Sequence, residues 1–346
     1  MGRKHRLALG VGEEGAEVAE AQPTAELDRT LGLEIVQVTE ATAVAAARLR
    51  GRGDEAAAET AAIGAMYRGL ARLPIQGVVV VGEGEENEAP LLYIGETVGA
   101  GSGQGLEVDV AVDPIEGSTL AAKALPNALA VVAIAERGSL LKVPVTYMDK
   151  IAIGPGYAEG LVDLDASPAD NLNALAKAKG VPVTEITACI LDRPRHAKLI
   201  EAVRAAGAAV RLIGDGDIAG VIHATEPQDT GIDIYLGVGG APEGVLAAAA
   251  LCCIGGQIQG RLVAMNAPQR ERAGAAGIVD FDRKYLMHDM ASGDVSFAAT
   301  GITDGSLLEG VRFTPNAIFT HSVVMRARTR TVRWIRTEFR DASALD

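Results

Sequence analysis

The sequence Glu107-Val108-Asp109-Val110-Ala111-Val112-Asp113-Pro114-Ile115-Glu116-Gly117-Ser118-Thr119 joins an alternating apolar run to a turn with two carboxylates and two hydroxyls. The alternation up to Val112 predicts a β-strand that ends at this turn. Pro114 would stiffen the exit from the strand, Gly117 would let the backbone approach a bound group, and a short helix opening at Ser118 would offer free N–H groups to phosphate. Mg²⁺ and Mn²⁺ prefer oxygen ligands in open sites that leave room for water and phosphate. The stretch therefore favours a divalent-metal phosphoesterase over its alternative, an ordinary polar turn.

Two further acidic loops follow apolar runs. Gly82-Glu83-Gly84-Glu85-Glu86-Asn87-Glu88 comes after the run 78–81, and Gly239-Gly240-Ala241-Pro242-Glu243-Gly244 lies between a strand-like run at 232–238 and a helical run at 245–254. Taken alone, the first is compatible with a solvated loop, and Glu243 with a residue that only complements the helix dipole in a first turn. Three acidic loops at the carboxyl ends of strands together predict metal ligands that converge in an α/β protein.

The composition argues against several classes of partner. The chain has 346 residues, and its 32 basic and 45 acidic side chains give a net charge of −13, which disfavours nucleic-acid binding. Its three cysteines, Cys189, Cys252 and Cys253, form neither a disulfide framework nor a zinc pattern. No uninterrupted apolar stretch reaches membrane-spanning length, and the basic start lacks an apolar signal-peptide core. We expect a cytoplasmic protein with no membrane or nucleic-acid partner.

The order of periodic segments predicts an α/β (α+β) protein. Residues 1–25 are rich in Glu, Ala and Gly and predict a flexible tail, followed by an N-terminal half at 26–160 with the metal loops and a C-terminal half at 161–340 with substrate loops. Helical spacing recurs at 31–49 and 63–73, before the first strand. Further on, strands expected at 129–134, 186–191, 210–213 and 232–238 alternate with helices near 171–179, 196–205 and 217–223. This alternation predicts a largely parallel or mixed sheet covered by helices.

Three other motifs allow competing interpretations. The segment 213–219 matches the relaxed G-x-G-x-x-A dinucleotide pattern, but Asp215 and Asp217 would place negative charge at a pyrophosphate, so sugar hydroxyls or a bare turn fit better. Arg193-Pro194-Arg195-His196 opens a helix and could clamp a phosphate remote from the metals, with a solvated first turn as the alternative. The arginine-rich run 326–336 fits a charged edge strand better than a nucleic-acid surface.

These motifs and several others, in this order, resemble the class II fructose-1,6-bisphosphatases of the lithium-sensitive phosphatase superfamily, some of which also act on sedoheptulose-1,7-bisphosphate. The similarity runs from about Leu31 to about Arg336. Besides the loops above, it rests on Gly51-Arg52-Gly53-Asp54, Glu88-Ala89-Pro90-Leu91-Leu92-Tyr93-Ile94-Gly95, Tyr147-Met148 and Ala299-Thr300-Gly301-Ile302.

The resemblance implies a layered α-β-α-β-α sandwich and hydrolysis of the 1-phosphate of fructose-1,6-bisphosphate with Mn²⁺ or Mg²⁺. It places Glu59 and Glu83 at one metal ion, and Asp113, Glu116 and Glu243 at the other. It assigns catalysis to Glu116 with Ser118 or Thr119, whose hydroxyl would orient the attacking water. Its substrate residues are Glu116, Gly117, Ser118, Tyr147, Arg193, Pro194, Arg195, Asp215, Gly216, Asp217 and Gly240. The expected partners are a sugar bisphosphate and further copies of the chain in a homo-oligomer.

Two departures from the family pattern keep alternatives open. Glu59 stands where the family has Asp, and its longer side chain must fold back or displace the ion. Ser118 stands where the family usually has Thr, which predicts slower turnover because the serine hydroxyl has more rotamer freedom. The alternatives are a related phosphatase that acts on another sugar or inositol phosphate, and a catalytically weak sugar-phosphate binder.

Overall fold

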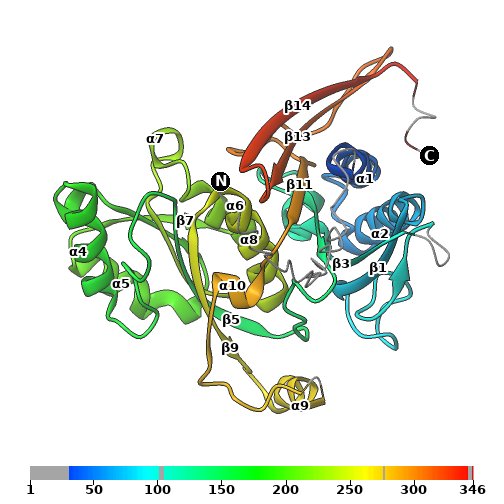
Figure 1. Cartoon of the computed structure of the whole chain (residues 1–346). Coiled ribbons are helices and arrows are strands. Elements are labelled where there is room, and N and C mark those ends of the chain that lie inside the picture. The colour runs from blue at the N-terminus through cyan, green and yellow to red at the C-terminus, as the bar shows by residue number, and fades with distance from the viewer. Residues whose placement is uncertain (1–30, 101–104, 276, 342–344, 346) are drawn as a thin grey trace, which may run out of the picture.

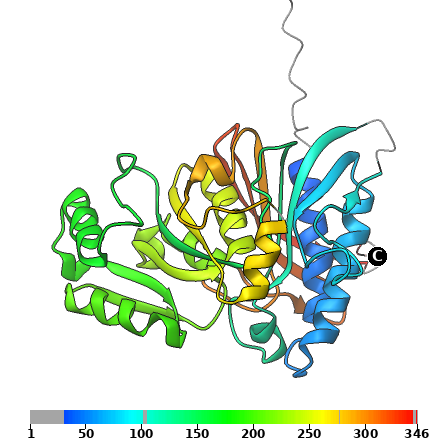
Figure 2. The ribbon, with the colours of Figure 1, turned by 90° about the horizontal axis from the view of Figure 1, so that it is seen from below.

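Two mixed β-sheets and three layers of helices build the protein, as a computed structural model shows for residues 31–100, 105–275, 277–341 and 345 (Figures 1 and 2). The tail expected at 1–25 lies outside the described residues. The first sheet has the strand order β12-β13-β11-β4-β3-β1-β2, with β14 also paired to β13, and the second has the order β10-β9-β5-β8-β6-β7.

The strands of the first sheet are β1 (Ile75–Val81), β2 (Thr97–Val98), β3 (Leu106–Glu116), β4 (Leu129–Glu136), β11 (Val295–Gly301), β12 (Arg312–Phe313), β13 (Ile318–Arg326) and β14 (Thr331–Phe339). Those of the second are β5 (Tyr147–Ile153), β6 (Thr187–Leu191), β7 (Ala209–Ile213), β8 (Ile234–Gly240), β9 (Gln257–Val263) and β10 (Lys284–Leu286). The helices are α1 (Leu31–Ala47), α2 (Glu55–Ala71), α3 (Ser118–Ala122), α4 (Pro168–Lys179), α5 (Ala197–Ala205), α6 (Asp217–His223), α7 (Pro227–Thr230), α8 (Ala241–Ile254), α9 (Ala267–Ala275) and α10 (Met287–Met290), with 3₁₀ turns η1 (Val183–Glu185) and η2 (Pro194–His196).

The outer helices cover opposite ends of the stack. On one side, α1 and α2 pack on the first sheet, where Ile35 and Met66 share a core cluster with Val110 and Ile134. On the other, α4 and α5 pack on the second sheet through a cluster that includes Leu172 and Ile190. These contacts form because the apolar residues of each helix recur at helical spacing and gather on the face toward the sheet.

The middle layer is α8, which lies between the two sheets (Figure 1). Its segment Ala247–Ala250 is fully buried, and its small side chains let both sheets approach the helix closely. Cys253 is buried on the same helix, as expected of a small core residue. The five layers confirm the expected α-β-α-β-α sandwich.

The chain passes between the sheets more than once. β5 already belongs to the second sheet, and β11 to β14 return to the first. β14 pairs with β13 alone among the described strands, so the expected charged edge strand is confirmed for 331–336, where Arg333 and Arg336 are exposed. Arg326 lies instead on β13, and Arg328 and Arg330 lie in the turn between the two strands. In the part of the chain that the structure describes, no helix has the length and apolar character to cross a membrane.

Parallel pairing places the acidic and basic loops at strand ends. β1 and β3 run parallel, so the loop at 82–88 and the turn at 113–118 leave the same edge of the first sheet. β6 pairs in parallel with both β7 and β8, so the loops that start near Arg193, Asp215 and Gly239 leave the same edge of the second sheet. These two edges supply the residues of the site described next.

Candidate metal and sugar-phosphate site

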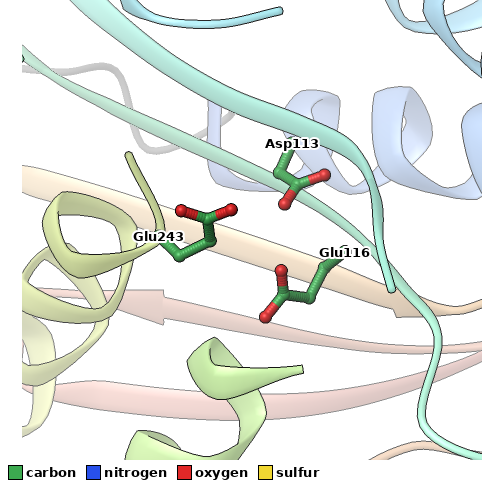
Figure 3. Close-up of side chains that lie close together, drawn as sticks. All are labelled: Asp113, Glu116 and Glu243. Atoms are coloured by element: carbon green, nitrogen blue, oxygen red, sulfur yellow. The ribbon is translucent and has the colours of Figure 1, made fainter. Parts of the chain in front are cut away.

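Three carboxylates from two elements converge between the sheets. Asp113 and Glu116 lie at the end of β3, where the pairing with β4 shifts register, and Glu243 lies in the first turn of α8. One oxygen from each comes within 4.8 Å of the others, and Figure 3 shows the three side chains pointing toward one another. Like charges held this close need a cation or a proton to offset their repulsion.

The hydrogen bonds of this trio leave room for a cation. Glu116 Oε1 accepts a hydrogen bond of 2.9 Å from the backbone N–H of Ile218, which fixes its orientation. Glu243 Oε2 is buried without a hydrogen-bond partner. A buried carboxylate oxygen without a donor is costly, and a hard divalent cation would satisfy it. The donor set, all carboxylate oxygens, therefore fits Mg²⁺ or Mn²⁺.

The trio borders a cavity of about 270 Å³. Glu83, from the loop after β1, and Glu59, from α2, line the same cavity, as does Ser118 at the start of α3. All five expected metal ligands thus lie around one space. Burial raises the pKa of Glu83, and the negative charge of nearby Glu59 raises it further.

A second hollow of about 320 Å³ adjoins the first and shares Glu116, Asp215 and Glu243 with it. Its wall includes Arg193 and Arg195, which project from the turn after β6. This side of the site offers positive charge next to the acidic trio.

Backbone acceptors and an aromatic ring hold the two arginines in place. Arg195 donates to the carbonyl oxygen of Val238 through Nε (3.0 Å) and Nη2 (2.7 Å), and its guanidinium lies 5.2 Å from the centre of the Tyr147 ring. Arg193 donates to the carbonyl of Gly214 and lies 3.7 Å from Asp215 Oδ1. Both guanidiniums are thereby oriented at a wall where a phosphate can contact them.

The comparisons with known proteins agree with this geometry. Residues 29–339 match the family described as bacterial fructose-1,6-bisphosphatase, glpX-encoded. The chain belongs to this family. It is 43% identical, over 336 residues, to the D-fructose 1,6-bisphosphatase class 2/sedoheptulose 1,7-bisphosphatase of Synechococcus sp. strain JA-3-3Ab; the match covers 90% of this chain and 96% of the relative. The protein of the same description from Synechococcus elongatus is 42% identical over 334 residues, with the same coverage. The chain is thus a phosphoric monoester hydrolase of the fructose-1,6-bisphosphatase family, whose members depend on metal ions.

The carboxyls of this fructose-1,6-bisphosphatase site hold protons at unusually high pH when metal is absent. Burial, followed by the charge of Glu243, raises the pKa of Asp113 well above its usual value, and burial followed by Asp113 does the same for Glu116. Burial raises the pKa of Glu83 to about 7, and raises that of Glu243 to about 7 with a further contribution from Asp217. Such shifts arise where carboxylates share a site meant for a cation.

The structure separates the other expected site residues into two groups. Ser118, Gly117, Tyr147, Asp217 and Gly240 line one of the two hollows. Pro194, Gly216 and Thr119 belong to the same turns but are not among the described residues that line either hollow. Ser118 begins α3 directly after Gly117, which adopts φ 85° and so depends on glycine's freedom at positive φ.

Sequence reasoning missed two residues of the site. Lys150, on β5, is buried and forms an ion pair with Asp217. Gln269, on α9, lines the hollow that contains the arginines. The sequence feature that could have identified Lys150 is its charge within the largely apolar strand Tyr147–Ile153. That feature indicates a site residue only when its ion-pair partner, Asp217, is known.

Proposed function

We propose that the chain releases the 1-phosphate of fructose-1,6-bisphosphate with the aid of Mn²⁺ or Mg²⁺ held by its carboxylates, giving fructose 6-phosphate and phosphate. The observation that supports this best is the pairing of two adjoining hollows. One is lined by the five carboxylates, and the other by two oriented arginines and Tyr147. A bisphosphate needs both a reaction centre and a remote anchor for its second phosphate.

We assign the carboxylates to two ions, as the family resemblance suggests. Asp113, Glu116 and Glu243 would hold one, and Glu59 with Glu83 the other. When bound, the divalent cations would lower the pKa of water and stabilise negative charge on the phosphoryl and leaving oxygens. The carboxylates act as fixed ligands and do not attack phosphorus.

The protein's own side chains would orient the reactants. The Ser118 hydroxyl would form a hydrogen bond with the water that attacks phosphorus. As the new phosphorus–oxygen bond forms, the bond between phosphorus and the sugar O1 would break, and the proton that the water loses would end on O1. Arg193 and Arg195 would bind the remote phosphate, and Asp215 with Asp217 would accept hydrogen bonds from the sugar hydroxyls. Binding energy far from the reacting bond then fixes its orientation.

The test is phosphate release from fructose-1,6-bisphosphate by protein stripped of metal and resupplied with Mn²⁺ or Mg²⁺. We expect metal-restored turnover in the wild type and none in Glu116→Ala, which lacks a ligand. Glu107→Ala is the matched control, because Glu107 is exposed at the start of the same strand, β3, and should leave turnover unchanged. Folded wild-type protein without turnover under either ion would refute the proposal, as would a fully active Glu116→Ala.

Sedoheptulose-1,7-bisphosphate is the second substrate that we propose. The two relatives carry both activities in their descriptions. The arginine-lined hollow adjoins the metal cavity and shares five wall residues with it, Glu116, Val145, Asp215, Pro242 and Glu243. The same assay with this substrate tests the point. The cytoplasmic location and the homo-oligomer stay predictions from the sequence, and light scattering on purified protein would measure the latter.

A further inference from the structure

A buried lysine lies beneath the sugar side of the site and has no role in the proposed chemistry. Lys150 is the only buried lysine or arginine among the described residues, at 1% exposure. Its ammonium group forms an ion pair with Asp217 and donates a 2.9 Å hydrogen bond to the carbonyl oxygen of Gly240. Both partners line the hollow with the arginines, Asp217 at the start of α6 and Gly240 at the end of β8.

Glycines bring the backbone directly against this ion pair. On β5, Lys150 lies opposite Gly237 of β8 and Gly260 of β9. A side chain at Gly239 would place its Cβ 2.9 Å from Lys150 Nζ and would overlap Asp217 Oδ2. A Cβ at Gly244 would lie 3.2 Å from Lys150 Cδ. The lysine therefore has little room for another rotamer, and its ammonium group is held at one point.

This arrangement uses one oxygen of Asp217 and leaves the other for a ligand. Lys150 Nζ donates a hydrogen bond to Asp217 Oδ2, and the Tyr235 hydroxyl donates a longer one, of 3.4 Å, to the same oxygen. Asp217 is buried, yet it lines the hollow beside Arg193 and Tyr147. Two donors on one oxygen fix the plane of the carboxylate, so its second oxygen is presented in one direction.

We propose that Lys150 is a positioning residue that orients Asp217, and with it the Gly240 turn, for recognition of the sugar. The inference rests on the proposed function, in which Asp217 accepts a hydrogen bond from a sugar hydroxyl. Lys150 does not touch substrate in this proposal. Its effect on binding passes through Asp217, which distinguishes it from an ion pair that only stabilises the fold.

The test combines Lys150→Met, Asp217→Asn and the double variant in metal-loaded protein. Methionine keeps an unbranched apolar stem and removes the charge. We expect Lys150→Met to raise KM for fructose-1,6-bisphosphate about tenfold, the effect of losing one hydrogen bond to a charged group, with a smaller change in kcat. Calorimetry with fructose 6-phosphate should show the same loss of affinity. In the Asp217→Asn background, Lys150→Met should raise KM by less than about a further twofold, because the effects of coupled residues are not additive.

Lys179→Met is the matched control. Lys179 pairs with the buried Asp233 at 2.6 Å in the same half of the chain but away from both hollows. It should lower the unfolding temperature and leave KM unchanged. A Lys150→Met variant that behaves like this control, losing stability with wild-type KM, would overturn the proposal.

The double variant keeps the proposal testable if Lys150→Met does not fold. Removing one member of a buried ion pair leaves an uncompensated charge, whereas removing both does not. A double variant with the KM of Asp217→Asn supports the proposal. A double variant whose increase in KM equals the product of the two single increases overturns it. Failure of the proposed function can be distinguished from failure of the Lys150 proposal, because in that case the wild-type protein would release no phosphate. The fructose 6-phosphate affinities would still decide the role of Lys150.

Discussion

Replacing Glu243 by Gln should make the metal-free protein more stable and should reduce its stabilisation by added metal. The folded protein holds the proton of Glu243 up to about pH 7, compared with 4.5 for an ordinary glutamate. A group with a raised pKa in the folded state stabilises the protein at low pH, and that stability is lost as the pH rises from about 4.5 through 7. Because each pKa unit is worth about 1.4 kcal/mol, the ionised carboxylate costs about 3 kcal/mol of unfolding free energy at pH 8. Glutamine has nearly the same shape and no such cost.

Thermal unfolding with and without Mn²⁺ measures both effects. For a chain of this length, about 3 kcal/mol corresponds to an increase in unfolding temperature on the order of 5 °C for metal-free Glu243→Gln at pH 8. The gain should shrink to below about 1 kcal/mol at pH 5, where the wild-type carboxyl is already protonated in the folded protein. Added Mn²⁺ should stabilise the wild type more than the variant, which has lost a ligand from the trio but keeps Glu59 and Glu83.

Glu201→Gln is the matched control, because Glu201 is exposed on α5 and lines neither hollow of the site. It should neither stabilise the metal-free protein nor change the effect of Mn²⁺. The reasoning fails if Glu243→Gln is no more stable than wild type at pH 8 without metal. It also fails if Mn²⁺ stabilises the variant as much as the wild type, because Glu243 would then not be a ligand.

Two further predictions concern the proposed ligand pair Glu59 and Glu83 and the proposed contact with the remote phosphate. Glu59→Asp introduces the residue that the resemblance implies at this position, and it should tighten Mn²⁺ binding and raise kcat, as titration and phosphate release would show. Weaker binding would mean that the site is built around the longer side chain. Arg195→Ala should raise KM for fructose-1,6-bisphosphate at least about tenfold through loss of a charged hydrogen bond, with less change for a sugar monophosphate. An unchanged KM would instead favour a substrate without a second phosphate.

The sequence predicted the layers better than it predicted every strand. α1, β3 and α8 were expected within about four residues of their observed bounds, because their apolar spacing is regular. α2 was expected at 63–73 but begins eight residues earlier, at Glu55. β11 was not expected. All its residues, Val295–Gly301, are buried, and a strand covered on both faces does not alternate. Its many small side chains weaken the signal further.

Site residues could be predicted from the sequence where the direction of their strands determines their position in the fold. Parallel β1 and β3 bring the loops of Glu83 and Asp113 to one edge, which the positions of the acidic loops suggested. Glu243 comes from α8, after a strand of the other sheet, so its distance from Asp113 depends on how the two sheets pack. That packing is a property of the buried middle layer and cannot be inferred from any single motif.

The glycines show how the site constrains its own scaffold. In the sequence, Gly239 and Gly240 look like ordinary loop residues before a helix. In the structure, a Cβ at Gly239 would overlap Asp217 Oδ2, and one at Gly240 would overlap Glu243 Oε2. Neither glycine needs positive φ, since Gly240 has φ −64°. Their role is therefore one of space, because each lets a carboxylate lie directly against the backbone. A larger residue at Gly239 or Gly240 would therefore displace the carboxylate of Asp217 or of Glu243 from its observed position.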